Sequence, residues 1–349
     1  MELLKNVSLA EFTTFKIGGK ADYFCVARSV AELQEAFAFA RSCSLPLFIL
    51  GGGSNVLMRD DGFRGLVVKI EIKNSPLEGS TPPVGGGRDV CIVVGAGESW
   101  DALVAETVAH GLWGVENLSG IPGTVGAAPI QNIGAYGSEV KEVIEWVEVL
   151  DKNTSAVRRF SRDECEFGYR DSIFKKPEGR DYIVTSVAFR LRKNGAPNLS
   201  YKDLAEYFAE KPDPSLVDIR RAVLEIRGRK FPDLKTHGTA GSFFKNPIIS
   251  QEKFDELKKK YPEFVGYQQP TTNNQPPTIK VSLAWILDKI CGLNGYKIDK
   301  VALWKNQPIV LVSQDGAGAK EISAFADDIA RIVKEKTGIE IEREVQNIC

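Results

Sequence analysis

The stretch GVENLSGIPGTVGAAPIQNIGAYG, residues 114–137, is dense in glycine and almost free of charge. Glycine has no Cβ atom and adopts positive φ angles readily, so its backbone N–H groups can approach an anionic ligand closely. The neutral side chains of Gln131 and Asn132 add hydrogen-bonding groups to the same stretch. This pattern indicates a long groove lined by backbone, of a kind that suits a dinucleotide.

A second glycine cluster, GGGSN at residues 51–55, directly follows a short buried strand predicted for LPLFIL at 45–50. Standard nucleotide motifs are absent from the chain. A Walker A loop fails at Gly19-Lys20 because Thr14 and Ala21 occupy the required positions. The G-x-G-x-x-G pattern fails after Gly95-Ala96-Gly97 because Trp100 replaces its last glycine. A phosphate site here would therefore be of another kind, and simple turns are the alternative interpretation.

The composition is that of an ordinary globular protein, with 349 residues, 43% hydrophobic and 26% charged, and a net charge of −1. This length suggests two or three domains. A near-neutral balance argues against nucleic acid or an anionic membrane as the main partner, because both favour a basic excess.

The 6 cysteines lie far apart without a C-x-x-C pair. This spacing fits neither a zinc site nor a disulfide framework, and it indicates a reducing compartment. No run approaches the ~18 apolar residues of a membrane span, and the N-terminus lacks a signal-peptide pattern. We therefore expect a cytoplasmic protein with no metal site.

The order of predicted elements favours an α+β fold. Hydrophobic periodicity predicts helices at 29–42, 99–111, 215–230 and 319–338. Strands are predicted at 45–50, 65–72, 90–97, 144–151, 157–160, 182–191 and 339–345, and an exposed loop at 74–89. Strict βαβ alternation, which a doubly wound sheet would require, is absent from this order.

The stretch HGTAGSFFKNP, residues 237–247, places Ser242 before two phenylalanines. The G-x-S-x-G pattern of a nucleophilic serine fails, because Ala240 and Phe244 stand where glycine is needed. The chain has only 2 histidines, His110 and His237, which leaves little for a Ser-His-Asp triad. If Ser242 does chemistry, we expect it to donate a proton rather than to attack.

Five stretches, taken in order, resemble the UDP-N-acetylenolpyruvoylglucosamine reductases. They are GGGSNVL (51–57), SGIPGTVGAAPIQNIGAYG (119–137), FGYRDSIFK (167–175), AGSFFKNP (240–247) and EREV (342–345). Each motif alone is weak evidence, but all five occur in the same order as in the family. The resemblance therefore covers nearly the whole chain, from about residue 12 to residue 345. PIQNIGAYG and SYKDL (200–204) resemble the branch of the family that carries an extra tyrosine loop over the substrate.

The resemblance implies an NADPH-dependent flavoenzyme with non-covalently bound FAD. Such enzymes reduce the enolpyruvyl group of UDP-N-acetylglucosamine enolpyruvate to give UDP-N-acetylmuramate, a step of peptidoglycan precursor synthesis on which cell shape and division depend. The partners implied are the UDP-sugar substrate and NADPH, and no obligate protein partner is evident.

The same resemblance implies the catalytic residues. Ser242 would be the proton donor, and Arg170 would pair with the substrate carboxylate. Glu344 would support the enolate that forms from that carboxylate. Glu342 and Glu344 lie on one face of the predicted last strand, and Arg343 stands where the family commonly has proline. A register shift of two residues would therefore put Glu342 in place of Glu344.

Further positions match substrate and cofactor contacts of the family. Tyr201 would close over the diphosphate and Lys230 would add positive charge to it, although both could be ordinary surface residues. The substrate contacts implied are Tyr169, Tyr201, Lys230, Asn246 and Gln307. The residues implied to cradle FAD are Gly51, Gly52, Gly53, Ser54, Asn55, Gly120, Pro122, Gly123, Gly126, Ile133, Gly134, Ala135 and Gly137.

Other residues of these motifs have structural interpretations. Arg170 could form an ion pair with Asp163 or Asp171. Phe243 and Phe244 are expected in the core or as walls that exclude water from the site, and Lys245 on the surface. We expect both histidines to be structural.

The resemblance also implies a domain order. An FAD-binding module of the PCMH/vanillyl-alcohol-oxidase-like type would occupy 1–231, in subdomains of about 1–70 and 71–231. An α/β substrate-binding domain would follow at 232–349, with its final strand returning toward the flavin.

Two alternatives remain at this point. One is an FAD-dependent oxidase of the same flavin-binding fold, and the other is a non-catalytic nucleotide-sugar binding protein. Several such oxidases attach flavin covalently through a histidine or cysteine near the glycine loops. Neither 51–57 nor 119–137 contains one.

Overall fold

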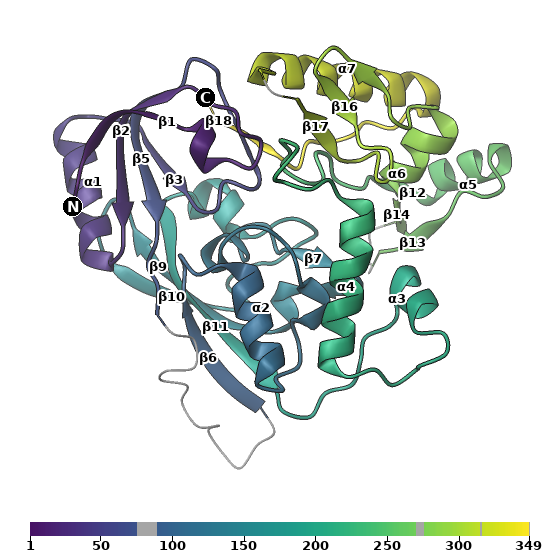
Figure 1. The fold of residues 1–349 in the computed structure, drawn as a ribbon, viewed down its shortest axis with the longest axis horizontal. Helices are drawn as coiled ribbons and strands as arrows, with labels where there is room; N and C mark the ends of the chain where they lie inside the picture. Colours follow the sequence, from purple (N-terminus) through teal and green to yellow (C-terminus); the bar gives the residue numbers. More distant parts are fainter. Residues whose placement is uncertain (75–88, 270–275, 315, 349) are drawn as a thin grey trace. The chain divides into compact units, whose positions relative to one another are not determined.

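The computed structural model describes residues 1–74, 89–269, 276–314 and 316–348 (Figure 1). The chain forms two compact units. Unit 1 comprises Met1–Val7, Lys20–Gly53 and Phe63–Arg229, and unit 2 comprises Ser8–Gly19, Ser54–Gly62 and Lys230–Cys349. Apart from its two end residues, the loop predicted at 74–89 lies outside the described residues.

Unit 1 begins with a four-stranded sheet of order β1-β2-β5-β3. Its strands are β1 (Leu4–Ser8), β2 (Lys20–Ala27), β3 (Leu47–Leu50) and β5 (Phe63–Ile70), and the last three run parallel. Helix α1 (Val30–Ser42) packs against it, as Figure 1 shows, and buries Leu33 and Phe37. The Ser29 hydroxyl accepts a hydrogen bond from the Glu32 N–H at 3.2 Å, which confirms the helix start predicted there.

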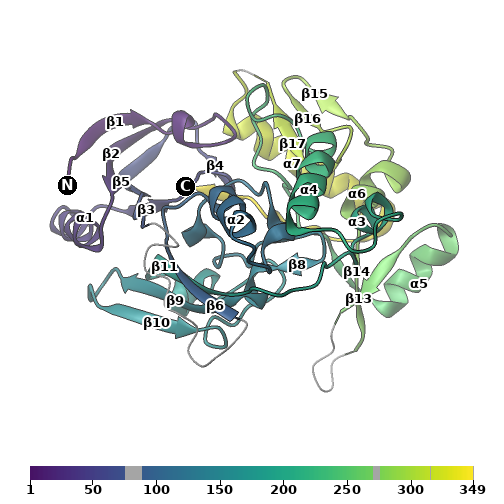
Figure 2. The same ribbon diagram turned by 60° about the horizontal axis from the view of Figure 1, so that its bottom comes forward.

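The second sheet of unit 1 is antiparallel, with the order β10-β9-β11-β6 (Figure 2). Its strands are β6 (Asp89–Gly95), β9 (Ile144–Asp151), β10 (Val157–Ser161) and β11 (Tyr182–Arg192). Helix α2 (Trp100–Ala109) packs on this sheet, because the Trp100 ring lies edge-on to Phe189 with 5.9 Å between centroids. The strands predicted for these four segments are confirmed.

Short elements and two helices complete unit 1. The glycine-rich segment has only short elements: η2 (Glu116–Leu118), η3 (Val125–Ala127), β7 (Gly134–Ala135), β8 (Ser138–Glu139) and η4 (Val140–Glu142). Further along are η5 (Ile173–Lys175), η6 (Pro177–Gly179), α3 (Lys202–Tyr207) and α4 (Leu216–Lys230). The predicted cap of α4 is present, since the Asp218 N–H donates to the Ser215 hydroxyl at 3.2 Å.

Unit 2 is built from small sheets and helices around its own core. Its strands are β4 (Val56–Met58), β12 (Ile248–Ser250), β13 (Gly266–Gln268), β14 (Thr278–Val281), β15 (Lys297–Ile298), β16 (Val301–Leu303), β17 (Leu311–Ser313) and β18 (Gln346–Ile348). Its helical elements are η1 (Ala10–Phe12), α5 (Gln251–Lys260), α6 (Leu283–Trp285), the π-helical turn η7 (Ile286–Ile290) and α7 (Ala319–Thr337).

Helix α7 is the longest of unit 2 and confirms the strongest helix prediction. The predicted apolar face, including Ile322, Phe325, Ile329 and Val333, is buried. Gly338 ends the helix in the left-handed conformation, with φ +71°.

The strand predicted at 339–345 is wrong. This segment forms an isolated bridge between Phe244 and Arg343. The Lys245 N–H donates to the Glu342 carbonyl at 2.9 Å and the Glu344 N–H to the Phe243 carbonyl at 2.8 Å, but the described residues form no regular strand here. Arg343 is held by helix α7, where its guanidinium donates to the Ser323 hydroxyl at 2.8 Å and pairs with Asp327 at 2.6 Å. The strand proper, β18, begins only at Gln346 and runs parallel to β4.

The mixture of a partly parallel sheet, antiparallel sheets and helices in irregular order confirms the predicted α+β fold. Within the described ranges, no helix is both long and apolar enough to cross a membrane.

Candidate functional site

In unit 1 the two glycine clusters lie directly against each other. A Cβ atom added to Gly52 would lie 2.8 Å from the Cα of Gly123, and one added to Gly51 would lie 2.9 Å from the Thr124 hydroxyl. Gly53 adopts φ +63°. Only glycine permits this approach, so the two segments together form a surface of bare backbone.

The glycine-rich loop is also fastened to the segment that starts helix α2. The Trp100 N–H donates to the Gly123 carbonyl at 3.1 Å, and the Gly126 N–H donates to the Ala96 carbonyl at 2.9 Å. A Cβ atom on Gly126 would lie 2.6 Å from that of Ala96. Gly120 and Gly137 have φ +71° and +83°. These contacts hold the loop in one shape before any ligand binds.

The non-glycine residues of unit 1 with left-handed backbones include Asn132 (φ +45°), Tyr136 (φ +48°) and Arg170 (φ +53°). This conformation is unfavourable for such residues and is retained only where the surroundings enforce it, as often happens at functional sites. All three belong to motifs that carry the family resemblance. Sequence patterns alone do not report such strain.

Arg170 lies against the far part of the glycine-rich loop. Its guanidinium donates to the Gly134 carbonyl at 2.7 Å and to the Asn132 carbonyl at 3.5 Å. The Tyr169 ring centroid is 5.5 Å from the Arg170 guanidinium carbon. The structure therefore brings Arg170 and Tyr169 together with Gly134 and, through the loop, with Ile133 and Ala135.

The prediction that the Asn132 side chain offers hydrogen bonds to a ligand is wrong. Asn132 is fully buried, and its amide donates to Glu139 at 3.0 Å and to the Gly168 carbonyl at 2.9 Å. Its carbonyl oxygen accepts from the Lys141 N–H at 3.1 Å. Asn132 thus ties the loop to the turn that carries Arg170.

The Tyr201 ring stands at the start of α3, beside the glycine-rich loop. Its centroid lies 5.4 Å from that of Tyr136, with the ring planes at 80°. Tyr201 is 43% exposed, whereas Tyr136 is 7% exposed. Burial raises the pKa of Tyr136 to about 12. Tyr136 was not predicted as a site residue from the sequence, because its contacts come from segments distant in the chain.

In unit 2, Ser242 is held on a rigid segment. The next residue, Phe243, donates its N–H to the Ile309 carbonyl at 2.9 Å, and Ser242 itself forms a bridge with Val310. Phe243 and Phe244 are buried in the core, as predicted. Ser242 itself is only partly buried. Its aromatic neighbours therefore fix its backbone, while its hydroxyl stays accessible.

The backbone of Glu344 lies beside this segment, and the Glu344 N–H donates to the Phe243 carbonyl at 2.8 Å. Glu342, the register alternative, is 75% exposed and pairs with Lys245 at 2.8 Å. The geometry thus places Glu344 next to the Ser242 segment and directs Glu342 to the surface.

Other expected residues of unit 2 lie near the same strands. Asn55 donates its side-chain amide to the Glu344 carbonyl at 3.3 Å, and its own carbonyl accepts from the Gln346 N–H at 3.1 Å. The Asn246 side-chain oxygen accepts from the Leu283 N–H at 3.0 Å, at the start of α6.

The remaining expected residues are at the edges of elements. Gln307 closes a turn between β16 and β17, and Lys230 ends α4. Ser54 precedes β4, and Pro122 is an exposed residue of the glycine-rich loop in unit 1.

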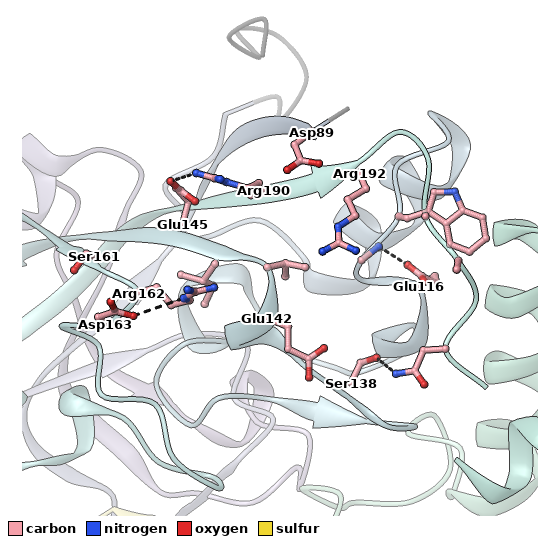
Figure 3. Close-up of a pocket in the computed structure, with 17 residues that line it drawn as sticks. Asp89, Glu116, Ser138, Glu142, Glu145, Ser161, Arg162, Asp163, Arg190 and Arg192 are labelled. Carbon is pink, nitrogen blue, oxygen red and sulfur yellow. Dashed lines mark hydrogen bonds and ion pairs between the residues drawn. The ribbon is translucent and has the colours of Figure 1, made fainter. Parts of the chain in front are cut away.

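A cavity of about 580 Å³ in unit 1 contains none of the expected residues (Figure 3). Its walls carry both signs of charge, including Glu116, Glu142, Arg190 and Arg192. Burial raises the pKa of Glu116, which accepts a hydrogen bond from the Gly114 N–H at 2.6 Å. In the part of the chain that the structure covers, no cluster of three metal-ligating side chains occurs.

Comparisons with known proteins cover both parts of the chain. Residues 21–160 match the FAD binding domain family, and residues 233–348 match the C-terminal domain of UDP-N-acetylenolpyruvoylglucosamine reductase. These matches confirm the predicted flavin-binding module and the family domain that follows it.

Relatives extend the similarity over nearly the full length. The UDP-N-acetylenolpyruvoylglucosamine reductase of Cupriavidus pinatubonensis is 41% identical over 96% of both chains, and that of Pseudomonas aeruginosa is 36% identical over 99% of this chain and 98% of its own. The crystal structure of the Thermus caldophilus enzyme is 25% identical, covers 100% of both chains and has a TM-score of 0.66. The chain therefore belongs to the UDP-N-acetylenolpyruvoylglucosamine reductase family.

Proposed function

We propose that this chain catalyses the reaction of its family, the NADPH-dependent reduction of UDP-N-acetylglucosamine enolpyruvate to UDP-N-acetylmuramate in peptidoglycan precursor synthesis. The observation that carries the proposal is the 41% identity to a reductase of this name over 96% of both chains. Bound FAD would supply the redox chemistry, by taking hydride from NADPH and passing hydride to the methylene carbon of the enolpyruvyl group.

The residues present fit FAD. Gly51 and Gly52 pack so closely against Thr124 and Gly123 that a side chain at either position would clash, which brings two stretches of glycine-rich backbone together. Backbone N–H groups of such stretches can approach an anionic group closely. We assign the cradle to Gly51, Gly52, Gly53, Ser54, Asn55, Gly120, Pro122, Gly123, Gly126, Ile133, Gly134, Ala135 and Gly137. In this set Ile133 is an apolar wall, since it is 8% exposed.

Ser242 donates the proton in this proposal. The carbon next to the methylene group needs a proton once hydride has arrived, and a positioned acid contributes roughly 10²–10⁴-fold to such a step. The hydroxyl is a poor acid in water, so it acts on a strongly basic carbanion in a site that excludes water. The buried rings of Phe243 and Phe244 support this assignment by fixing the serine backbone.

Arg170 and Glu344 stabilise the enolate of the substrate carboxylate. The planar guanidinium of arginine matches a carboxylate, and fixed charges are most effective where charge develops. The Arg170 guanidinium already donates to the Gly134 carbonyl, so its orientation is set before substrate binds. The position of Glu344 beside the Phe243 carbonyl supports its choice over the surface residue Glu342.

Substrate binding is assigned to Tyr169, Tyr201, Lys230, Asn246 and Gln307. The contact of Tyr169 with Arg170 and the exposure of Tyr201 support the two tyrosines. Asn246 would engage the nucleotide through its amide N–H groups, because its oxygen already accepts from Leu283.

We further propose a cytoplasmic location and function without an obligate protein partner. The dispersed cysteines support a reducing compartment, since all five that the structure describes are free thiols. Each unit buries a hydrophobic core of its own, as a chain that folds without a partner needs to do.

Anaerobic spectroscopy tests the function. The purified protein should be yellow, lose its colour with NADPH, and regain it rapidly when UDP-N-acetylglucosamine enolpyruvate is added without oxygen. Bleaching without recovery would contradict the substrate assignment and favour the flavin oxidase. Denaturation should release intact FAD, because both glycine loops lack a histidine or cysteine for covalent attachment.

A further inference from the structure

Asp101, in the first turn of α2, joins the glycine-rich loop to helix α4. Its Oδ1 accepts hydrogen bonds from the Gly120 N–H at 2.6 Å and from Arg220 at 2.7 Å. Its Oδ2 accepts a second bond from the same guanidinium at 3.0 Å. Burial works against ionisation, but the bonds from Arg220 and Gly120 keep the pKa of Asp101 below its ordinary value.

The link continues along α4 to Arg227. Arg227 follows Arg220 by seven positions, about two turns of helix, so both side chains lie on the same face of α4. A Cβ atom on Gly120 would lie 3.1 Å from the Arg227 Nε, so the loop and this side chain are in close contact. Burial lowers the pKa of Arg227, and the negative charge of Asp101 opposes that shift.

From Arg227 the contacts lead to the Tyr201 ring. The Arg227 guanidinium is hydrogen-bonded to the Tyr136 hydroxyl, and the Tyr136 ring supports Tyr201 edge-on at 5.4 Å. The amide of Asn117 adds a backbone link, since it donates to the carbonyls of Tyr136 at 2.8 Å and Asn198 at 2.9 Å. The left-handed backbone of Tyr136 needs such support.

We propose that Asp101 is a positioning residue for substrate binding, because its carboxylate holds both Arg220 of helix α4 and the Gly120 loop, between which Arg227 contacts the Tyr136 ring that supports the Tyr201 segment. This inference rests on the proposed function in one respect, namely that Tyr201 closes over the substrate diphosphate. If the Asp101–Arg220 pair were only a structural ion pair, its loss would have no specific effect at Tyr201.

Hydrogen exchange without substrate tests the link directly. In the FAD-bound Asp101→Asn variant we expect faster exchange in the peptide that spans residues 198–205, where the Leu204 and Ala205 N–H groups donate to the Tyr201 carbonyl. Glu106→Gln is the matched control, because it removes the same charge from α2 and the Glu106 carboxylate contacts no described residue through a hydrogen bond or ion pair. Unchanged exchange in Asp101→Asn would overturn the proposal.

Steady-state kinetics provide a second readout. We expect Asp101→Asn to raise the substrate KM about fivefold or more, the usual lower range of coupling between sites, with a smaller change in kcat. In a Tyr201→Ala background the same substitution should have no further effect on KM, whereas independent effects would multiply and overturn the proposal.

Arg220→Lys keeps the charge but loses the two-pronged contact, so it should act in the same direction more weakly, and it replaces Asp101→Asn if that variant does not fold. If the wild type itself fails to reduce the UDP-sugar, the proposed function is wrong, but the exchange measurement still decides the role of Asp101.

Discussion

At the residue scale, the proposed reaction depends on a weak acid, the Ser242 hydroxyl, whose backbone is fixed by its neighbours. The backbone of Phe243 is bonded on both sides, to Ile309 through its N–H and to Glu344 through its carbonyl. This arrangement fixes the position of the Ser242 hydroxyl. Proton transfer then depends on the strong basicity of the substrate carbanion.

Ser242→Ala should lower substrate turnover by roughly 10²–10⁴-fold, the usual contribution of a general acid. The rate at which NADPH bleaches the flavin should stay unchanged, because Ser242 acts only after hydride has left the cofactor. Stopped-flow absorbance resolves the two half-reactions in one sample. Full substrate turnover with normal flavin content in this variant would remove Ser242 from the mechanism.

Glu344→Gln and Glu342→Gln form a matched pair that separates the two possible registers. Removing the Glu344 carboxylate should lower kcat by roughly 10²-fold, the low end for a positioned catalytic group. Glu342 is an exposed partner of Lys245, and such pairs contribute little, so its variant should retain nearly full activity. The reverse result would show that the catalytic glutamate is two residues earlier.

The motifs single out candidate site residues, but the environment of each residue depends on contacts that the motifs do not encode. The motif around Ser242 indicated a proton donor rather than a nucleophile from the letters alone. The burial of the Asn132 side chain could not be predicted, because its hydrogen-bond partner Gly168 lies 36 residues further along the chain. The support of Tyr136 by Arg227 is likewise a tertiary contact without a local sequence pattern.

At the element scale, the helices with a long apolar face were predicted well and the short elements were not. The apolar stripe of α7 extends over 19 residues and dominates the local sequence. Helix α5 has 10 residues, of which only Leu257 is buried, so its sequence lacks such a stripe. The alternation in IEIEREV predicted a strand at 339–345, but alternation cannot show over how many residues a neighbouring segment pairs with it, and here the bonds to 243–245 are too few for a regular strand.

The start of α7 depends on a residue far away in the sequence. Asp60 accepts hydrogen bonds from the Ala319 N–H at 2.7 Å and the Lys320 N–H at 3.3 Å, and so caps the helix with a negative charge. Asp60→Ala should lower the free energy of unfolding by about 1 kcal/mol, measured by urea denaturation. The neighbouring Asp61 pairs with Arg59 on the surface, so Asp61→Ala should cost clearly less. Equal losses in the two variants would contradict the cap.

At the scale of the whole molecule, the two units are interleaved along the chain. Unit 2 takes residues 8–19 and 54–62 from the N-terminal part of the sequence. These segments supply Phe15 and Leu57, which are 1% and 2% exposed in its core. They also supply β4, which pairs with the final strand β18.

This interleaving predicts that residues 230–349 do not fold when expressed alone. The isolated fragment would lose the buried side chains of Phe15 and Leu57, and losses of this kind cost about 3–5 and 2–5 kcal/mol each when a single core residue is truncated. Domains are stable by only about 5–15 kcal/mol, so the combined loss removes most of the margin. Thermal melting followed by circular dichroism should show a cooperative transition for the full chain and none for the fragment. A sharp transition in the fragment would mean that the C-terminal part has a sufficient core of its own.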